Sequence, residues 1–353
     1  MQGVLKAPLV SVILLNYNGK AKLGSILEDC LASLFSTDYP NFELLFVDNG
    51  STDHSVEYVN KKFGQTPQLR VVRNERNFGF AEGNNRGIKA AKGEYIALVN
   101  TDTRVDSAWL RELVEAIQSP DVGAVQSKLL MMHSPDLLDS GGGLLDYYGY
   151  HVERGRGEKA AVYNRTAEVF YAKGAGVLIK SKALQKTGLL DPDIFMYFDE
   201  TDLCWRLRLC GFKMFYIPNS IVYHASGVTA SILQERNRLF FHVRNHLLVL
   251  LKNYGLGNLV KAGAVSILLE LRNLILFLVR GKPLVSLAIV QALFWNLRSL
   301  KVTWGKRRVV QEIIRVVPDS EVKKAMLKPY PPFPLYLVFS RFRYIKHKQK
   351  INT

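Results

Sequence analysis

The sequence predicts an α/β fold with a mostly parallel central sheet, followed by C-terminal amphipathic and hydrophobic helices. Short β-branched apolar runs alternate with helical segments over residues 1–120. This alternation is typical of parallel strands joined by right-handed crossovers. Polar clusters directly follow two of these runs, at the strand ends where open α/β sheets bind ligands. From residue 232 onward the chain is instead strongly apolar with helical spacing.

The individual elements follow from the hydrophobic periodicity. Within residues 1–120, strands are predicted at Val10–Leu15, Glu43–Val47, Leu69–Val72 and Tyr95–Val99, and helices at Leu23–Phe35 and Ala108–Gln118. Within residues 121–231, strands are predicted at Val177–Lys180 and Lys213–Ile217, and a helix at Asp199–Cys210. Gly211 stands where glycine commonly ends a helix. We therefore expect one domain over residues 1–231, with halves at about 1–120 and 121–231.

Three apolar segments, Asn245–Leu251, Ala262–Val279 and Pro283–Leu300, dominate residues 232–353. A membrane-spanning helix needs about 20 predominantly apolar residues, and Glu270 and Arg272 interrupt the longest segment. Lysines and arginines punctuate all three, which is typical of helices that lie in the lipid interface. The sequence thus predicts a membrane-associating region, and a buried helical bundle with a solvated basic face is the alternative.

The positive charge is concentrated in this last region. Residues 232–353 hold 22 Lys and Arg against 5 Asp and Glu, whereas the whole chain holds 47 against 31 and has a net charge of +16. A basic segment attracts polyanions. Because no nucleic-acid-binding module accompanies the charge, we expect a membrane surface with anionic lipids as the partner, and no nucleic acid.

Cysteine usage and the first residues indicate the compartment. Cys30, Cys204 and Cys210 have neither metal-site spacing nor an even number for a disulfide framework, so a reducing compartment is expected. The starting residues lack the pattern of a signal peptide, because their apolar run is short and ends in polar turn residues. We expect a monotopic or peripheral protein at the cytoplasmic face of a membrane, or one with one or two spanning helices.

Several polar residues follow predicted strands and can carry chemistry. Asp102 ends the run after Tyr95–Val99, where a carboxylate can hold a divalent cation that binds diphosphate oxygens. Asp48 can accept hydrogen bonds from a base or ribose. The Gly- and Asn-rich loop Asn77–Gly87 can let the backbone approach a nucleotide sugar closely. Each also has a simpler interpretation as an ordinary turn or loop.

The sharpest cluster lies at the start of the helix predicted at Asp199–Cys210. Asp199, Glu200 and Asp202 follow the aromatic run Phe195–Phe198. A carboxylate beside aromatic rings is partly desolvated, which raises its pKa toward that of a useful base. The helix dipole alone also explains acidic residues at this end. Asp202 and Arg206 have the spacing of a helical ion pair.

His224 follows a short apolar run at a strand end. A lone histidine is more often structural. Together with Asp102 it can complete a metal site of one carboxylate and one imidazole.

The order of these pieces resembles the inverting family 2 glycosyltransferases with a GT-A fold, and most of all their rhamnosyltransferase-like branch. The resemblance covers residues 9–227. The motifs that carry it are VSVILLNYNG, ELLFVDNGSTDHS, NFGFAEGNNRGI, GEYIALVNTDT, GAGVLIK, YFDETDLCWRLRLCGF and IVYH. Each motif is weak alone, but their shared order is highly specific.

The resemblance implies roles by position. Nucleotide-sugar contacts fall to Asn16, Asp48, Asp53, Gly79, Asn84, Asn85 and Asn100. Asp102 matches the last Asp of the family's metal-binding Asp-x-Asp, whose first position here is Asn100. Mg²⁺ or Mn²⁺ is therefore the expected cofactor, with His224 as a further ligand. Glu200 occupies the place of the catalytic base, and Asp199 is the second candidate because this chain reads Asp-Glu where the family usually has Glu-Asp.

These roles predict transfer of a sugar from a nucleotide-diphosphate sugar to an acceptor hydroxyl with inversion. The apolar basic region favours a lipid-linked saccharide or glycan acceptor in cell-surface glycan assembly. Two alternatives remain open. A sugar-phosphate nucleotidyltransferase needs a Gly-rich basic loop near the first strand, for which residues 16–20 are a poor substitute. A catalytically silent membrane-bound scaffold does not need the carboxylates that this chain retains.

Overall fold

The structure, a computed structural model, describes residues 7–226 and 234–329. Its core is a sheet whose first half is parallel as predicted, with the order β4-β1-β2-β3. The strands are β1 (Val10–Asn16), β2 (Phe42–Asp48), β3 (Leu69–Arg73) and β4 (Tyr95–Asn100). Asn16 pairs with Asp48, and Leu15 with Asn100. The polar residues at the carboxyl ends of these strands are therefore in one row.

The second half of the sheet is mixed. Its strands are β5 (Thr103–Val105), β6 (Val122–Met131), β7 (Ser134–Ser140), β10 (Ala167–Val169), β11 (Val177–Lys180) and β12 (Lys213–His224). β11 runs antiparallel to both β4 and β6, whereas β6 and β12 are parallel. The expectation of a mostly parallel sheet therefore describes the first half. β12 is longer than the predicted Lys213–Ile217 because it extends past an irregularity to pair with β5.

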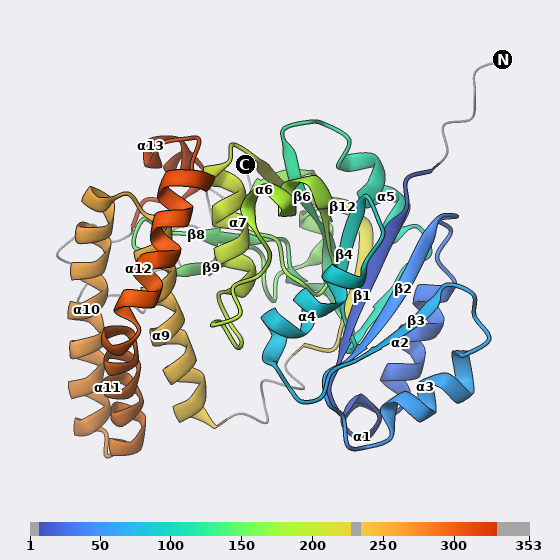
Figure 1. Cartoon of the computed structure of the whole chain (residues 1–353), viewed down its shortest axis with the longest axis horizontal. Helices are drawn as coiled ribbons and strands as arrows, with labels where there is room; N and C mark the ends of the chain where they lie inside the picture. Colours follow the sequence, from blue (N-terminus) through green and yellow to red (C-terminus); the bar gives the residue numbers. More distant parts are fainter. Residues whose placement is uncertain (1–6, 227–233, 330–353) are drawn as a thin grey trace.

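Helices cover both faces of the sheet (Figure 1). One face packs against α2 (Ser25–Phe35) and α5 (Trp109–Ala116), and the other against α4 (Gly79–Ala90), α6 (Ser181–Thr187) and α7 (Asp199–Leu209). The remaining elements of this part are α1 (Gly19–Leu23), α3 (Ser55–Phe63), a short 3-10 turn (Ala160–Val162) and the hairpin of β8 (Gly143–Leu145) and β9 (His151–Glu153). The segment predicted as one helix, Leu23–Phe35, is broken at Gly24, whose φ is 55°.

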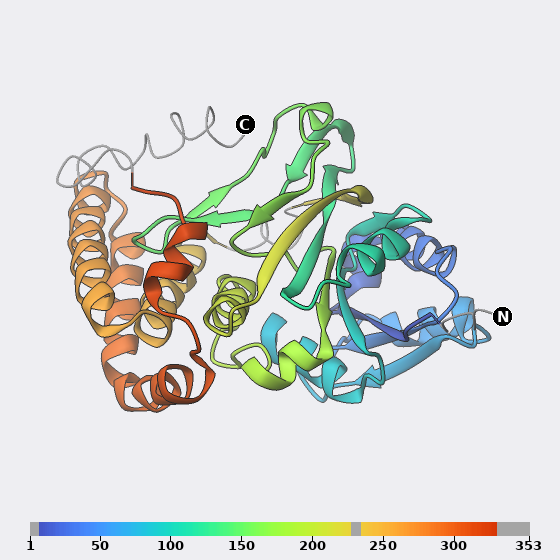
Figure 2. The same cartoon turned by 90° about the horizontal axis from the view of Figure 1, so that it is seen from above.

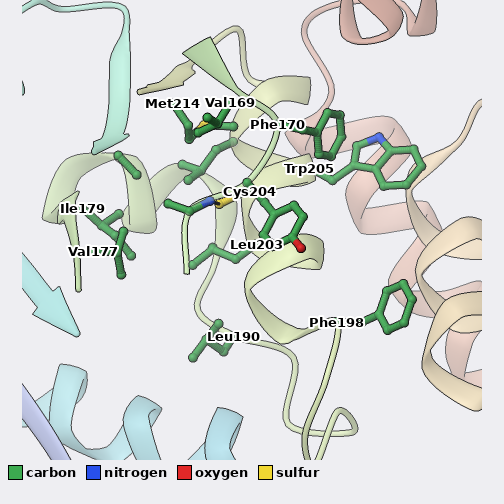
Figure 3. Close-up of a cluster of buried hydrophobic side chains, with 14 of the residues drawn as sticks. Val169, Phe170, Val177, Ile179, Leu190, Phe198, Leu203, Cys204, Trp205 and Met214 are labelled. Atoms are coloured by element: carbon green, nitrogen blue, oxygen red, sulfur yellow. Dashed lines mark hydrogen bonds between the residues drawn. The ribbon is translucent and has the colours of Figure 1, made fainter. Parts of the chain in front are cut away.

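The core around α7 joins the sheet to the C-terminal helices. Phe170 and Trp205 meet edge to face, with ring centroids 5.6 Å apart. Trp205 also contacts Tyr254 of the following region in the same way. Figure 3 shows this cluster, in which Phe198 points toward the C-terminal helices. α7 ends as predicted, since Gly211 follows it with a φ of 87°.

The C-terminal helices form a separate layer beside the sheet domain (Figures 1 and 2). They are α9 (Glu235–Asn253), α10 (Leu256–Val279), α11 (Pro283–Arg298), α12 (Leu300–Arg308), a π-helical segment (Val309–Ile314), α13 (Asp319–Val322) and a short 3-10 turn (Lys323–Ala325). α10 starts six residues before the predicted Ala262 and reaches 24 residues. The predicted domain boundary at residue 231 lies outside the described residues.

α10 is long and apolar enough to cross a membrane, and only 28% of its apolar window is buried. The pair of α11 and residues 300–314 passes the same test as one unit, but it is bent by 59°. Large apolar side chains are exposed along α10 and α11, among them Ile267, Leu271, Ile275 and Val279 of α10 and Leu284, Leu287, Val290, Phe294 and Leu297 of α11. Their spacing of three and four residues places them on one outer stripe of each helix.

A buried ionic cluster joins this helical layer to the sheet domain. Lys252 of α9 contacts Asp191 and lies 3.0 Å from Asp202 of α7. Asn253 donates to Asp202 at 2.9 Å. Lys306 of α12 contacts Asp191 and Asp193. The basic C-terminal region is thus not uniformly solvated, since part of its charge pairs with acidic residues of the first domain.

Candidate active site

A cleft of about 390 Å³ opens at the carboxyl ends of β1 and β4. Its walls come from the β1–α1 connection, the β4–β5 turn, the segment before α7 and the end of β12. Asn100, Asp102, Asp199, Glu200 and His224 all line it. The carboxylate that follows β4 and the carboxylates that begin α7 therefore face one shared cavity.

Asp102 and His224 meet because β5, directly after Asp102, pairs with the end of β12. The Nε2 atom of His224 lies 3.3 Å from Oδ1 of Asp102, and its Nδ1 atom lies 2.9 Å from Oδ2 of Asp139. Asp139 is buried in β7 and also accepts a 2.8 Å hydrogen bond from Ser226 Oγ. The imidazole is thus held between two carboxylates.

These contacts shift the pKa values of His224 and Asp139. Burial disfavours the imidazolium, but the hydrogen bonds and charges of Asp102 and Asp139 outweigh it and raise the pKa of His224 to about 9. Burial likewise opposes the Asp139 carboxylate, yet His224 and Ser226 lower the pKa of Asp139 to about 2. Without a bound cation, His224 is therefore protonated at neutral pH.

The Asp102–His224 pair fits a divalent metal. A carboxylate oxygen and an imidazole nitrogen face each other at the cleft, and both are common metal ligands. Asp139 contacts the other ring nitrogen, as partners of metal-bound histidines usually do. Within residues 7–226 and 234–329, no group of three or more His, Cys, Asp or Glu residues could hold a metal. The two side chains therefore leave positions for oxygen atoms of a ligand.

Asp199 and Glu200 form a coupled pair at the first turn of α7. Burial, followed by the neighbouring charge of Glu200 and a hydrogen bond to it, raises the pKa of Asp199 well above its ordinary value. The protonated form of Asp199 is therefore favoured over that of an exposed aspartate. Glu200 lies at the cleft, and its Oε1 accepts a 3.0 Å hydrogen bond from the backbone N–H of Gly174. Asp199 is thus the buried member of the pair, and Glu200 is the more accessible one.

Aromatic side chains make up much of the remaining wall. Tyr17, Phe80, Phe195 and Tyr197 line the cleft, and the Lys22 ammonium lies 4.3 Å from the Tyr17 ring centroid. Gly79 also lines the cleft with a φ of 80°, and a Cβ there would lie 2.5 Å from the Phe195 ring. Glycine at this position lets Phe195 approach the start of α4.

The predicted nucleotide-side residues divide into two groups. Gly79 and Asn100 line the cleft, whereas Asn16, Asp48 and Asp53 lie behind its wall. Asn16 Nδ2 donates to Asp48 Oδ1 at 3.1 Å, and Asp48 Oδ2 accepts from the Ser51 N–H. Asp53 accepts from the N–H groups of Ala21 and Ser55. These contacts hold the β1–α1 and β2–α3 loops together.

The two asparagines of α4 are buried and do not line the cleft. Asn84 Nδ2 donates to the Phe80 carbonyl one turn earlier at 2.9 Å. Asn85 exchanges two hydrogen bonds with the backbone of Leu190, at 2.8 and 3.0 Å. Asn85 therefore ties α4 to the segment that leads into α7.

Asp202 and Arg206 also lie away from the cleft. They form the predicted pair at 3.0 Å, and Arg206 further donates to the carbonyls of Thr187, Gly188 and Leu189. Asp202 additionally contacts Lys252, as described above. This pair therefore holds α7 between α6 and the C-terminal helices.

The structure adds residues that the sequence did not single out. Asn49 lines the cleft and donates to the Gly79 carbonyl at 3.1 Å; its place directly after Asp48 was a usable signal. Lys22 brings a positive charge to the cleft. Asp139 gave no local signal, because β7 reaches His224 only through its pairing with β6.

Comparisons with known proteins show the family to which the chain is related. The protein family described as "Glycosyl transferase family 2" matches residues 11–131. The family described as "Glycosyl transferase family group 2" matches residues 95–303. A poly-beta-1,6-N-acetyl-D-glucosamine synthase of Staphylococcus epidermidis is 26% identical over 220 residues, which are 61% of this chain and 49% of the synthase. The chain spans 24%, 38% and 49% of the lengths of three curated relatives that it matches.

Solved structures share the fold. S. aureus TarS 1–349 in complex with UDP has a TM-score of 0.54 at 15% identity, over 97% of this chain and 90% of that one. The mannosyltransferase PcManGT from Pyrobaculum calidifontis, in complex with GDP-Man and Mn²⁺, has a TM-score of 0.52 at 19% identity, over 83% and 88%. The match over residues 95–303 covers more than half of the chain and, with the family 2 match over residues 11–131, identifies this protein as a member of the glycosyl transferase family 2 group.

Proposed function

We propose that this protein is an inverting glycosyltransferase that moves a sugar from a nucleotide-diphosphate sugar to an acceptor hydroxyl. One observation carries the proposal: the Asp102–His224 pair and the Asp199–Glu200 pair line the same cleft. A proton acceptor and a cation that neutralises the diphosphate both favour this reaction, and the candidate residues for both roles face one cavity. Membership of family 2 supports glycosyl transfer over the nucleotidyltransferase and scaffold alternatives.

Glu200 is the proposed base. It removes the proton from the acceptor hydroxyl as that oxygen bonds to the anomeric carbon, and the diphosphate leaves with the electron pair of the broken bond. Asp199 is the weaker candidate because its burial and the neighbouring charge of Glu200 favour its protonated form. The Gly174 N–H holds one oxygen of Glu200, which orients the other for proton transfer. This assignment favours Glu200 over Asp199.

Asp102 and His224 are the proposed metal ligands, with Asp139 orienting the imidazole. A bound divalent ion supplies charge neutralisation for the departing diphosphate. The Mn²⁺ complex of the mannosyltransferase supports a metal of this kind. Such a leaving group needs no protein acid, whereas glycosidases typically require one.

The nucleotide is proposed to bind at the β1 and β2 side of the cleft. This side of the cleft is proposed to be shaped by the two loops that Asn16, Asp48 and Asp53 hold together. The position of α4, which depends on Gly79, Asn84 and Asn85, is proposed to shape it as well. Asn100 at the Asp-x-Asp position, together with the motif order, supports the rhamnosyltransferase-like branch.

The acceptor is proposed to be a lipid-linked saccharide or glycan in cell-surface glycan assembly. The exposed apolar stripes of α10 and α11 and the basic residues that flank them support contact with an anionic membrane. The similarity to the poly-N-acetylglucosamine synthase supports a role in extracellular polysaccharide synthesis. The cytoplasmic face, where nucleotide sugars are available, is the proposed side.

A panel of UDP-, GDP- and dTDP-sugars tests the activity. Slow hydrolysis of one donor, dependent on Mn²⁺ or Mg²⁺, is expected for the wild type. Glu200→Gln should lower turnover by about 10²–10⁴-fold and leave nucleotide binding nearly intact. Wild-type turnover by this variant would show that Glu200 is not the base. Release of pyrophosphate from a nucleoside triphosphate and a sugar phosphate would instead favour a nucleotidyltransferase.

A further inference from the structure

The segment Asp191–Phe198 links the substrate cleft to α7. Phe195, Met196 and Tyr197 line the cleft, and the segment ends directly at the Asp199–Glu200 pair. Its last two residues, Tyr197 and Phe198, have φ values of 64° and 68°. Two consecutive non-glycine residues in the left-handed region are unfavourable for the backbone alone. Contacts from other elements must therefore hold this turn.

Asn245 of α9 supplies two of these contacts. Its side chain is fully buried. Its Nδ2 atom donates to the carbonyls of Met196 and Tyr197, at 2.8 and 3.0 Å. These carbonyls belong to the peptide bonds immediately before and after Tyr197. One amide group therefore bridges the left-handed turn.

Arg244 fixes the direction of that amide. Arg244 Nε donates to Asn245 Oδ1 at 2.8 Å, so the amide oxygen faces the guanidinium and Nδ2 must face the turn. Arg244 also donates to the Asp193 carbonyl near the start of the same segment. Adjacent residues of α9 thus contact the segment at two points.

Aromatic contacts complete the support. The Tyr197 ring stacks on His242 of α9, with centroids 4.3 Å apart and planes 20° apart. The Phe198 ring stacks on His151 at 4.1 Å and contacts His246 of α9 at 5.6 Å. One helix of the C-terminal layer therefore contacts both left-handed residues.

We infer that Asn245 is a positioning residue for glycosyl transfer, which acts by holding the 196–198 turn that presents Glu200 to the cleft. The inference rests on the proposed role of Glu200 as the base. It makes α9 part of the active site, although α9 contributes no residue to the cleft lining. Through Asn245, the helical layer that carries the apolar stripes is thereby joined to the turn that presents the proposed base.

Asn245→Asp tests the inference. The substitution keeps the shape of the side chain but replaces the Nδ2 donor with an oxygen that repels the two carbonyls. Turnover of the donor that is hydrolysed fastest in the UDP-, GDP- and dTDP-sugar panel should fall at least about tenfold, because small misplacements of catalytic groups are costly. The dissociation constant for the matching nucleoside diphosphate with Mn²⁺ should change less than about threefold, because Asn245 bonds to the 196–198 turn and to Arg244 and not to the β1 and β2 residues proposed for the nucleotide.

Asn296→Asp is the matched control. Asn296 of α11 donates to the Arg244 carbonyl of α9 at 3.1 Å but makes no contact with the turn. Turnover by the Asn296→Asp variant should stay within about twofold of the wild type. Unchanged turnover in Asn245→Asp would overturn the inference, and so would equal losses in both variants. Retained turnover in Glu200→Gln would instead reject the proposed base itself.

A second comparison decides the matter if Asn245→Asp does not fold. Glycine adopts the left-handed conformation without penalty, so Tyr197→Gly should make the turn less dependent on the hydrogen bonds from Asn245. Asn245→Ala should then lower turnover by a smaller factor in the Tyr197→Gly background than in the wild type. Equal factors in both backgrounds would contradict the inference.

Discussion

Glu200 Oε1 lies 3.0 Å from the backbone nitrogen of Gly174, so the proposed base is held by the connection between β10 and β11. A Cβ at position 174 would lie 3.1 Å from that oxygen and 2.8 Å from the Phe80 ring. Gly174→Ala should therefore displace Glu200 and lower turnover by about 10-fold or more. Steady-state kinetics with the preferred donor will measure this. An unchanged rate would mean that Phe80 moves aside and the contact is not needed.

Asp199→Asn should stabilise the fold at neutral pH. In the folded state the pKa of Asp199 is raised, so between about pH 4 and that raised value the folded state binds a proton that the unfolded state releases. The wild type consequently loses stability as pH rises through this range. The variant should gain at least about 1 kcal/mol at pH 7 and nothing near pH 3, as measured by urea unfolding. A gain that does not depend on pH would contradict a protonated Asp199.

The Asp191–Lys252–Asp202 cluster should govern acid stability. Burial opposes both carboxylates, but Lys252, Lys306 and Arg206 lower the pKa of Asp191 and of Asp202. Their contribution is therefore complete above about pH 4 and is lost as pH falls toward the lowered values. Lys252→Met should cost about 3–5 kcal/mol at pH 7, and less at pH 3.

The control for this cluster is Lys282→Met. Lys282 pairs with Glu235 at 2.8 Å on the surface, so its loss should cost less than about 1 kcal/mol. Urea midpoints at pH 7 and pH 3 will compare the two variants. Equal costs would show that the buried cluster contributes no more than a surface pair.

Asp139→Asn should weaken metal-dependent donor binding without removing a proposed ligand. The amide no longer favours the ring orientation that Asp139 imposes on His224. Mutation of a residue that hydrogen-bonds a metal-binding histidine typically lowers metal affinity or activity by about 10–100-fold. Titration of a nucleoside diphosphate with and without Mn²⁺ will measure the effect beside Asp102→Ala, which should lose most of the metal dependence. If Asp102→Ala binds equally with and without metal, Asp102 is not a ligand.

The exposed stripe of α11 should mediate membrane binding. Phe294 and Leu297 are 62% and 70% exposed, so Phe294→Asp combined with Leu297→Asp should leave the fold intact. Flotation with vesicles that contain anionic lipid should show at least about a tenfold loss of binding. Val162→Asp is the control, since Val162 is 61% exposed but lies in the sheet domain. Retained binding by the double variant would place the membrane contact elsewhere.

The sequence predicted the fold class and, among the elements that line the cleft, β1, β4 and α7, because these depend on local periodicity. It also predicted that Asp102, His224, Asp199 and Glu200 matter, although only the tertiary structure places them in one cavity. The contacts of Asn84 and Asn85 could not be predicted from the sequence. Their Gly- and Asn-rich segment resembles a loop, but in the structure it forms α4.

The break of the first helix at Gly24 and the role of α9 were likewise not predictable. Periodicity reports which face of a helix is apolar, but not which backbone carbonyl a buried amide reaches. Asn245 begins the apolar segment Asn245–Leu251, and Lys252 directly follows it. The sequence predicted that this segment contacts lipid. Their partners, Tyr197 and Asp202, are about 50 positions earlier in the chain.

The pairing of β5 with β12 has a consequence for biogenesis. Asp102 is synthesised long before His224, and the two meet only when the last strand of the sheet docks beside β5. Such distant pairing is a late event in folding, because it must overcome the entropy of closing a long loop. The growing chain therefore cannot bring the two proposed metal ligands together until this last strand of the sheet has been made.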